Sequence, residues 1–272
     1  MTAPVVFLDI ETLPAYDSPE WRAHAETLPA VAAATDRVTR ASAALVALID
    51  AGPKRPAANL TDPAKIAAAL EKRTQEHAAD LVAAREALTD AVDAVAPAME
   101  AALRATSLDP LWGRVCCVGL AVDDGEPMVL AADTEAGTLL AVQVWLAEVA
   151  SQRRGPIVYV MHNGRGFDVP FLRVRSIVHN LPALARAFGA WRGKPWESPL
   201  VDTMELWPST GRGAFTRLQA IRRALGLPVQ VGIDGSQVAA AWHDGRRDEV
   251  IRHCREDVAG LREVYYRIRD VL

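Results

Sequence analysis

The segment that most constrains this chain is Val-Val-Phe-Leu-Asp-Ile-Glu-Thr, residues 5–12. Its branched and aromatic residues predict a buried strand. Residues two apart on a strand face the same side, so Asp9 and Glu11 project together. Two carboxylates this close repel each other, and a divalent cation such as Mg²⁺ or Mn²⁺, which prefers oxygen ligands, relieves that repulsion. Taken alone, the pair is more typical of a strand that ends in a solvated acidic turn.

Composition places the chain among ordinary globular proteins. Its 272 residues, 50% of them hydrophobic and 24% charged, suit one large domain or one domain with an insertion. No run is long and apolar enough to cross a bilayer, and no basic segment precedes Val5, so we expect a cytoplasmic protein without membrane association. The cysteines Cys116, Cys117 and Cys254 form no CxxC pair, which predicts neither a zinc site nor a disulfide framework. The net charge of −4 gives no overall basic field to attract nucleic acid.

An alanine-rich stretch follows the first strand and has helical spacing. One helix is expected from Ser18 to about Ala51, bent or broken near Pro29. A second is expected from Pro63 to about Val95, with Pro97 interrupting it. Two long helices around a short connection predict an antiparallel helical hairpin. Its role is either structural packing, or docking of a partner or of a second copy of the chain.

Alternating strands and helices resume after this stretch. Strands are expected at 115–122, 128–130 and 157–161, and helices at 134–152, 169–178, 182–188, 215–225 and 247–268. The pattern predicts an α/β domain with a mixed central sheet flanked by helices. We therefore expect residues 1–14 and 112–272 to form one domain, with residues 15–111 inserted as a helical hairpin arm after the first strand.

Two further acidic residues have defined places in this pattern. Asp168 closes the segment His-Asn-Gly-Arg-Gly-Phe-Asp, residues 162–168, and stands where a helix starts, which is also the place of an ordinary helix cap. His253 and Asp257 are four residues apart in a strongly helical segment and share one face, which is also typical of a surface pair.

Together these segments resemble the DEDD superfamily of 3′–5′ exonucleases, which has an RNase H-like fold. Asp9-Ile10-Glu11 resembles its first motif, residues 162–168 resemble the second, and residues 234–238 with 253–258 resemble the third. The form of the last motif is similar to that of exonucleases related to the proofreading domain of family B DNA polymerases. The resemblance covers residues 1–14 and about 112–270. Four acidic positions in the family's order are far more specific than any one motif.

His253 departs from the pattern of this family. Its tyrosine-type members carry Tyr four residues before the last Asp, and its histidine-type members carry His five residues before it. This chain has His253 at the tyrosine spacing and Arg252 at the histidine spacing. One residue along a helix is about 100° of rotation, so the two placements are not equivalent. His253 is either the general base of the reaction or an inert replacement.

The resemblance implies phosphodiester hydrolysis with two bound ions, Mg²⁺ or Mn²⁺. Asp9 would bridge both ions, Glu11 and Asp257 would hold the one that activates water, and Asp168 would support the other. His253 would be the candidate base. The expected substrate is a single-stranded 3′ end, with DNA favoured over RNA. Candidate substrate contacts are Thr12, Leu13, Asn163 and Asp202; as alternatives, Asn163 is a turn residue and Asp202 caps the next helix.

A second hypothesis comes from a different class of function. The chain would be a nucleic-acid-binding or scaffolding module with an inactive nuclease fold, acting through the helical arm. Retention of all four acidic residues favours the enzyme, and the unusual His253 is the one point that favours inactivity. A general α/β phosphohydrolase is disfavoured because the sequence has no glycine-rich phosphate loop.

Overall fold

The computed structural model describes residues 3–16, 18–152, 155–191, 198–207 and 215–269. The chain divides into two compact units. The first, which we call the sheet unit, comprises Met1–Ala15 and Thr106–Leu272, and the second, the helical arm, comprises Tyr16–Ala105.

The sheet unit contains a five-stranded mixed sheet in the order β3-β2-β1-β4-β5. The strands are β1 (Val5–Leu13), β2 (Arg114–Val122), β3 (Met128–Leu130), β4 (Val158–Met161) and β5 (Leu200–Asp202). β1 pairs antiparallel with β2 and parallel with β4, so the first strand of the chain lies at the centre of the sheet. β2 and β3 pair antiparallel as a hairpin, and β4 and β5 run parallel. The structure thereby confirms the expected α/β fold with a mixed central sheet.

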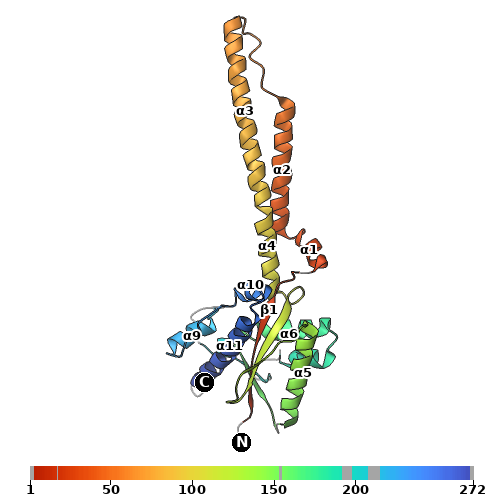
Figure 1. The fold of residues 1–272 in the computed structure, drawn as a ribbon, viewed down its shortest axis with the longest axis vertical. Coiled ribbons are helices and arrows are strands. Elements are labelled where there is room, and N and C mark those ends of the chain that lie inside the picture. Colours follow the sequence, from red (N-terminus) through yellow and green to blue (C-terminus); the bar gives the residue numbers. More distant parts are fainter. Residues whose placement is uncertain (1–2, 17, 153–154, 192–197, 208–214, 270–272) are drawn as a thin grey trace. The chain divides into compact units, whose positions relative to one another are not determined.

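Helices cover both faces of this sheet. Figure 1 shows α5 and α11 on opposite sides of β1. The helices of the unit are α5 (Glu135–Gln152), α6 (Asp168–Val178), α7 (Pro182–Ala190), α8 (Thr203–Leu206), α9 (Leu218–Ala224), α10 (Val238–His243) and α11 (Arg247–Ile268), with a short 3₁₀ turn at Thr106–Leu108. The short elements β5, α8 and α10 are additions to the expected pattern, because segments of three to six residues carry too little periodicity to be recognised.

Side chains of β1 point alternately to the two faces of the sheet, and this determines which helices they pack against. Leu8 and Ile10 pack in the cluster that includes residues of α5, α6 and α7. Phe7 packs against residues of α11, and Leu13 packs against residues of α10 and α11. Asp9 and Glu11 have the same parity as Phe7 and Leu13. Their side chains therefore face the α11 side of the sheet.

A buried ion pair joins α5 to α6. Glu135 of α5 accepts hydrogen bonds from Arg175 of α6 at 2.9 and 2.6 Å and from the Val115 amide at 2.8 Å, and lies 2.6 Å from His179 Nε2. Burial opposes ionisation of Glu135, but these hydrogen bonds and the charge of Arg175 outweigh it, and the pKa lies below its ordinary value. The pair fixes α6, whose first residue is Asp168.

A glycine brings α11 close to the sheet. Gly119 of β2 lies opposite Asp9 of β1. A Cβ atom at Gly119 would lie 2.6 Å from Val258 Cγ2 and 3.0 Å from the Cys254 carbonyl oxygen, both on α11. Only a residue without a side chain allows this approach. The close packing places the middle of α11 directly over Asp9.

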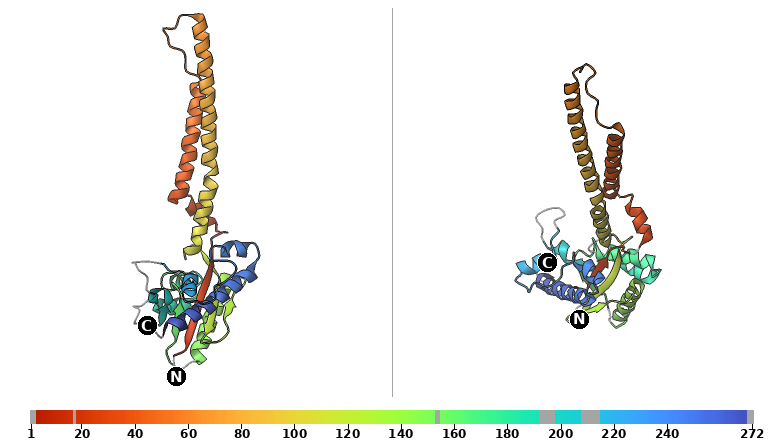
Figure 2. Two further views of the ribbon diagram at one scale, coloured as in Figure 1. Left: turned by 90° about the vertical axis from the view of Figure 1, so that its left-hand side faces the viewer. Right: turned by 45° about the horizontal axis from the view of Figure 1, so that its top comes forward.

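The helical arm consists of α1 (Pro19–Ala25), α2 (Pro29–Ala51), α3 (Pro63–Asp93) and α4 (Val95–Ala105). The expected break near Pro29 is confirmed. Pro97 was expected to interrupt the second helix, but it lies in the first turn of α4 and the helices are divided at Ala94 instead. A proline is tolerated there because first-turn amides need no intrahelical acceptor. The views in Figure 2 show α2 and α3 side by side along their length.

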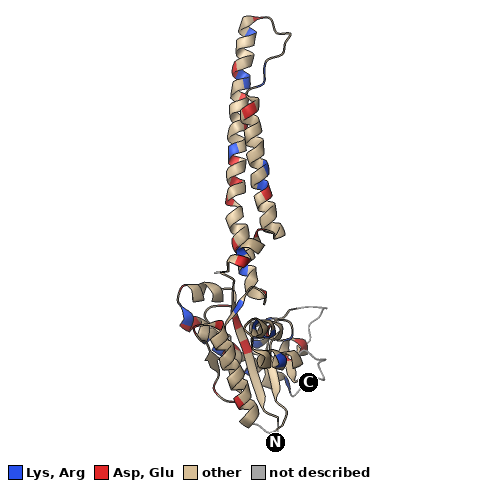
Figure 3. Ribbon diagram, turned by 90° about the vertical axis from the view of Figure 1, so that its right-hand side faces the viewer, with Lys and Arg blue, Asp and Glu red and all other residues tan. Residues whose placement is uncertain are grey.

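Charges of both signs are interspersed along α2 and α3, as Figure 3 shows. Such a pattern is typical of a solvated helix surface. Among the described residues, none of the helices combines the length and the apolar character that a membrane crossing requires.

The buried ion pair predicts a pH-dependent stability. Because the folded pKa of Glu135 is lowered, its contribution is present above the ordinary value of 4.5 and is lost as pH falls through the folded value. We expect Glu135→Gln to reduce the free energy of unfolding by about 3 kcal/mol at pH 7, and by less towards pH 3. Urea melts at several pH values measure this, with the exposed Glu148→Gln on the same helix as control. A difference that is independent of pH would contradict the prediction.

Replacing the glycine under α11 should separate that helix from the sheet. Gly119→Ala is expected to cost about 2 kcal/mol of stability, because the added methyl meets a backbone carbonyl that cannot move aside. Gly235→Ala is the control, since a Cβ there meets nothing within 4 Å. Equal urea midpoints for the two variants would show that α11 is not held as tightly as the structure indicates.

Candidate metal centre

The centre of the site is the end of β1. Glu11 is buried, with 8% of its surface exposed, and Asp9 is partly exposed. Asp9 lies opposite Gly119 of β2, and Glu11 lies opposite Cys117. β1 and β4 run parallel, so the loop that leaves β4 starts at the same edge of the sheet where β1 presents its acidic residues.

Asp168 reaches this edge from α6. It is the first residue of the helix and is 3% exposed. Burial raises its pKa to about 7, while hydrogen bonds from its own amide and from the Ile10 amide act in the opposite direction. The contact with the Ile10 amide places this carboxyl group against β1, between Asp9 and Glu11 along the strand.

α11 supplies Asp257 and His253. Four residues apart, they lie on one face of the helix, with His253 Nε2 3.3 Å from Asp257 Oδ2. The same nitrogen lies 3.4 Å from Glu11 Oε1. Asp257 also accepts a hydrogen bond of 3.2 Å from Gln219 Nε2 on α9. The structure therefore brings together the four acidic residues and the histidine that were singled out in the sequence.

These carboxyl groups destabilise each other's charged forms. Burial raises the pKa of Asp9 well above its ordinary value, and the charges of Asp168, Glu11 and Asp257 raise it further. Burial likewise raises the pKa of Glu11, with contributions from Cys117, Asp257 and Asp168. Burial also raises the pKa of Asp257, although His253 and Gln219 act against it.

The donor set fits a hard divalent cation. In the part of the chain that the structure describes, neither Lys nor Arg forms an ion pair with these four carboxylates. Ligand atoms of Glu11, His253 and Asp257 lie within 4.8 Å of one another, as do those of Asp9, Glu11 and Cys254. Asp168 is in neither group and acts on the cluster through its charge. Clustered carboxylates are the ligands that Mg²⁺ and Mn²⁺ prefer.

Thiols line the buried side of the cluster, a feature that cysteine spacing did not indicate. Cys254 Sγ lies 4.0 Å from the Asp9 carbonyl oxygen. Hydrogen bonds from the Cys116 and Cys254 thiols lower the pKa of Cys117 to about 5, despite its burial. The three cysteines are free. Because they come from β2 and α11, only the folded structure brings them together.

Thr12 and Leu13, two of the candidate substrate contacts, make contacts within the protein. Thr12 donates a hydrogen bond of 2.7 Å to the Ser107 carbonyl oxygen, which ties the end of β1 to the 3₁₀ turn. Leu13 is 2% exposed and packs in the core beside Cys117 and Cys254. Its burial gives it a role in the core and leaves almost no surface for a base to contact.

Asp202 and Asn163 shape the loop after β4. Asp202 is 3% exposed and accepts hydrogen bonds from the backbone amides of Asn163, Arg165 and Met204. It therefore caps α8 and holds the loop that leads to Asp168. Asn163 has a φ of +63°, a left-handed conformation that asparagine adopts more readily than most residues. These contacts agree with the turn and cap alternatives for the two residues.

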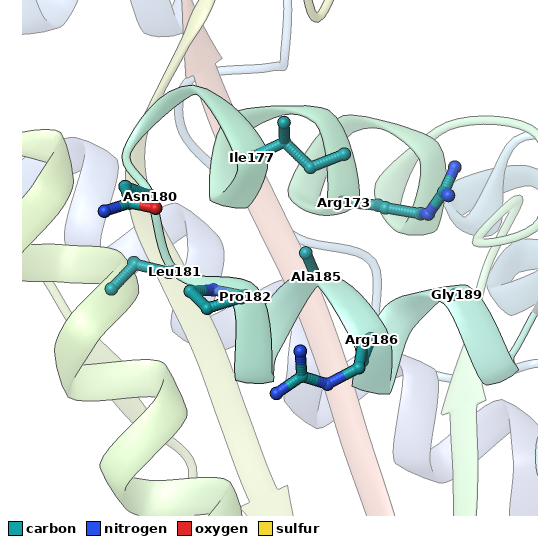
Figure 4. Close-up of a pocket in the computed structure, with 8 residues that line it drawn as sticks. All are labelled: Arg173, Ile177, Asn180, Leu181, Pro182, Ala185, Arg186 and Gly189. Carbon is teal, nitrogen blue, oxygen red and sulfur yellow. The ribbon is translucent and has the colours of Figure 1, made fainter.

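Gln219 and Gln230 are site residues that sequence reasoning missed. Gln219 lies on α9 and contacts Asp257, and Gln230 lies in the following loop and contacts His253. Nothing in their spacing marks them, because a single glutamine belongs to no metal-binding or catalytic pattern. A pocket of about 540 Å³ between α6 and α7, with Arg173 and Arg186 in its lining, contains none of the site residues (Figure 4).

Comparisons with known proteins agree with the resemblance seen in the motifs. Residues 142–271, just under half of the chain, match the family described as "Predicted 3'-5' exonuclease related to the exonuclease domain of PolB". The family B DNA polymerase of the hyperthermophilic archaeon Pyrobaculum calidifontis is structurally similar, with a TM-score of 0.49 and 21% identity. That match covers 59% of this chain and 22% of the polymerase chain. No curated protein sequence matches. Residues 142–271 are thus similar to a family of predicted exonucleases related to the polymerase B exonuclease domain.

The repulsion within the cluster predicts that a cation stabilises the protein. Millimolar Mn²⁺ should raise the melting temperature by about 5 °C or more through binding to the folded state. Asp9→Asn should raise the melting temperature of the metal-free protein, since it removes one of the charges that repel each other, and should remove most of the Mn²⁺ effect. Thermal melts with EDTA and with Mn²⁺ measure both, and Asp133→Asn, at a fully exposed acid, is the control. Equal metal-induced shifts in all three proteins would contradict a metal centre at β1.

Proposed function

We propose, from this relationship to polymerase B-type exonucleases, that the protein is a metal-dependent 3′–5′ exonuclease acting on single-stranded nucleic acid ends. The observation that carries the proposal is the convergence of Asp9, Glu11, Asp168 and Asp257. They come from β1, α6 and α11, and no Lys or Arg among the described residues pairs with them. Bringing four acidic side chains together is unfavourable, which suits a site that gains its stability from bound cations.

The acidic residues would bind two ions, either Mg²⁺ or Mn²⁺. Glu11 and Asp257, which share His253 as a neighbour, would hold one ion, Asp168 would support the other, and Asp9 would contact both. When bound, two such ions stabilise charge on the attacking and leaving oxygens of a phosphodiester. Glu11 and Asp168 are buried, whereas Asp9 and Asp257 are partly exposed, so the last two would lie nearest to an entering strand end.

The substrate assignment rests on the relationship rather than on a contact. The family is named for its likeness to the exonuclease domain of a DNA polymerase, which favours DNA over RNA. The sheet unit would carry the chemistry, and the helical arm would dock a protein partner or a second copy of the chain.

The decisive experiment is a nuclease assay with 5′-labelled single strands. The protein is incubated with DNA or RNA, with Mg²⁺, Mn²⁺ or EDTA. We expect a metal-dependent ladder that shortens from the 3′ end, faster on DNA. Asp9→Asn, Asp168→Asn and Asp257→Asn should each reduce the rate about 100-fold or more, because each removes a charged oxygen ligand.

Matched controls separate chemistry from folding. Asp133→Asn changes the charge equally at a fully exposed position and should cleave at the wild-type rate. Circular dichroism and melting curves verify that every variant is folded. If both polymers stay intact while the wild type still binds Mn²⁺, the exonuclease proposal is wrong, and the binding or scaffolding function through the helical arm takes its place.

A further inference from the structure

Two glutamines connect α9, the loop after it and α11 in one hydrogen-bonded chain. The Gln230 backbone amide donates to Gln219 Oε1 at 3.2 Å, and Gln219 Nε2 donates to Gln230 Oε1 at 2.7 Å. Gln219 Nε2 also donates to Asp257 Oδ1 at 3.2 Å. Gln230 Nε2 lies 3.0 Å from the His253 carbonyl oxygen and 2.7 Å from His253 Nδ1.

Backbone groups fix the orientation of both amides. A backbone N–H only donates, so the end of Gln219 that faces the Gln230 amide is its oxygen. A carbonyl only accepts, so the end of Gln230 that faces the His253 carbonyl is its NH₂ group. With these ends fixed, each remaining contact in the chain pairs a donor with an acceptor. The network therefore has one consistent polarity.

That polarity determines the tautomer of His253. Gln230 directs a donor at Nδ1 over 2.7 Å, so Nδ1 accepts and carries no proton. The ring proton then resides on Nε2, which faces Glu11 Oε1 at 3.4 Å and Asp257 Oδ2 at 3.3 Å. Rotating the ring by 180° would bring a carbon to 2.7 Å from Gln230 Nε2 and would remove the nitrogen from the carboxylates.

We propose that Gln219 and Gln230 are positioning residues that hold His253 as an Nε2–H donor to Glu11 and Asp257. The histidine then presents a proton to the carboxylate cluster and has no lone pair there, so it orients two carboxylates and is not the general base. The role in hydrolysis rests on the proposed exonuclease function, whereas the tautomer does not. Gln219 completes the arrangement by holding both Gln230 and Asp257.

Nitrogen NMR of the histidine rings tests the tautomer directly. The wild-type protein is labelled with ¹⁵N-histidine and measured at rising pH until the His253 signals stop changing, so that the neutral ring is observed. His253 is assigned among the six histidines by the signal that disappears in His253→Gln. We expect the pattern of Nε2–H with a free Nδ1. An Nδ1–H pattern for His253 would overturn the inference, whether or not the protein cleaves nucleic acid.

Gln230→Glu reverses the polarity of the key hydrogen bond. A carboxylate of the same length accepts where the amide donated, so Nδ1 should become protonated in this variant. Gln230→Met, which offers neither donor nor acceptor, should give a mixture of tautomers. Gln230 is partly exposed, so both variants should fold. A tautomer that is the same in all three proteins would show that Gln230 does not set it.

A second pair of variants separates a donor from a base in the nuclease assay. Gln at position 253 keeps an N–H near the place of Nε2 but cannot take up a proton, and Met keeps neither property. We expect His253→Gln to cleave within about tenfold of the wild-type rate and His253→Met about 100-fold more slowly than the wild type. If both lose activity equally while Mn²⁺ still stabilises them, His253 is the base and the inference is wrong. If the wild type does not cleave, only the exonuclease proposal fails, and the NMR result still decides the tautomer.

Discussion

Repulsion among the clustered carboxylates opposes the folded state of this protein, and the other contacts of the fold must outweigh it. Asp9 and Glu11 alternate onto one face of the central strand, and α6 and α11 bring Asp168 and Asp257 to them. Each approach raises the free energy of the metal-free protein. The apolar clusters on both faces of the sheet, with the buried Glu135–Arg175 pair, supply the stability that holds the acids together. A site of this kind keeps its geometry only within a rigid surrounding fold.

The close packing of α11 against the sheet positions two side chains of the site. Gly119 lets the helix backbone come down to the sheet opposite Asp9, and one turn of that helix then carries both His253 and Asp257. A larger residue at 119 would move both side chains together. The two glutamines form hydrogen bonds with the same helical turn. Close packing sets the distance of the helix, and hydrogen bonds set the orientation of its side chains.

The sequence predicts the parts of this site that come from local pattern. Asp9 and Glu11 follow from strand alternation, the helix start at Asp168 from the glycine-containing loop before it, and the shared face of His253 and Asp257 from helical spacing. It does not predict that Leu13 lies in the core, because a residue at a strand end can face either way. The sequence also does not predict the roles of Gln219, Gln230 and Gly119. These roles arise from contacts between segments far apart in the chain, which leave no local pattern.

His253 shows why a replacement at a buried site involves its neighbours. A tyrosine at this spacing would bring one polar atom, whereas an imidazole brings two nitrogens. The His253 side chain is only 8% exposed, so its second nitrogen costs free energy unless it is hydrogen-bonded. Gln230 satisfies it, and in doing so decides which nitrogen keeps the proton. His253 and Gln230 therefore work as a pair: the chemistry that the histidine offers to Glu11 and Asp257 is set by a residue that touches neither carboxylate.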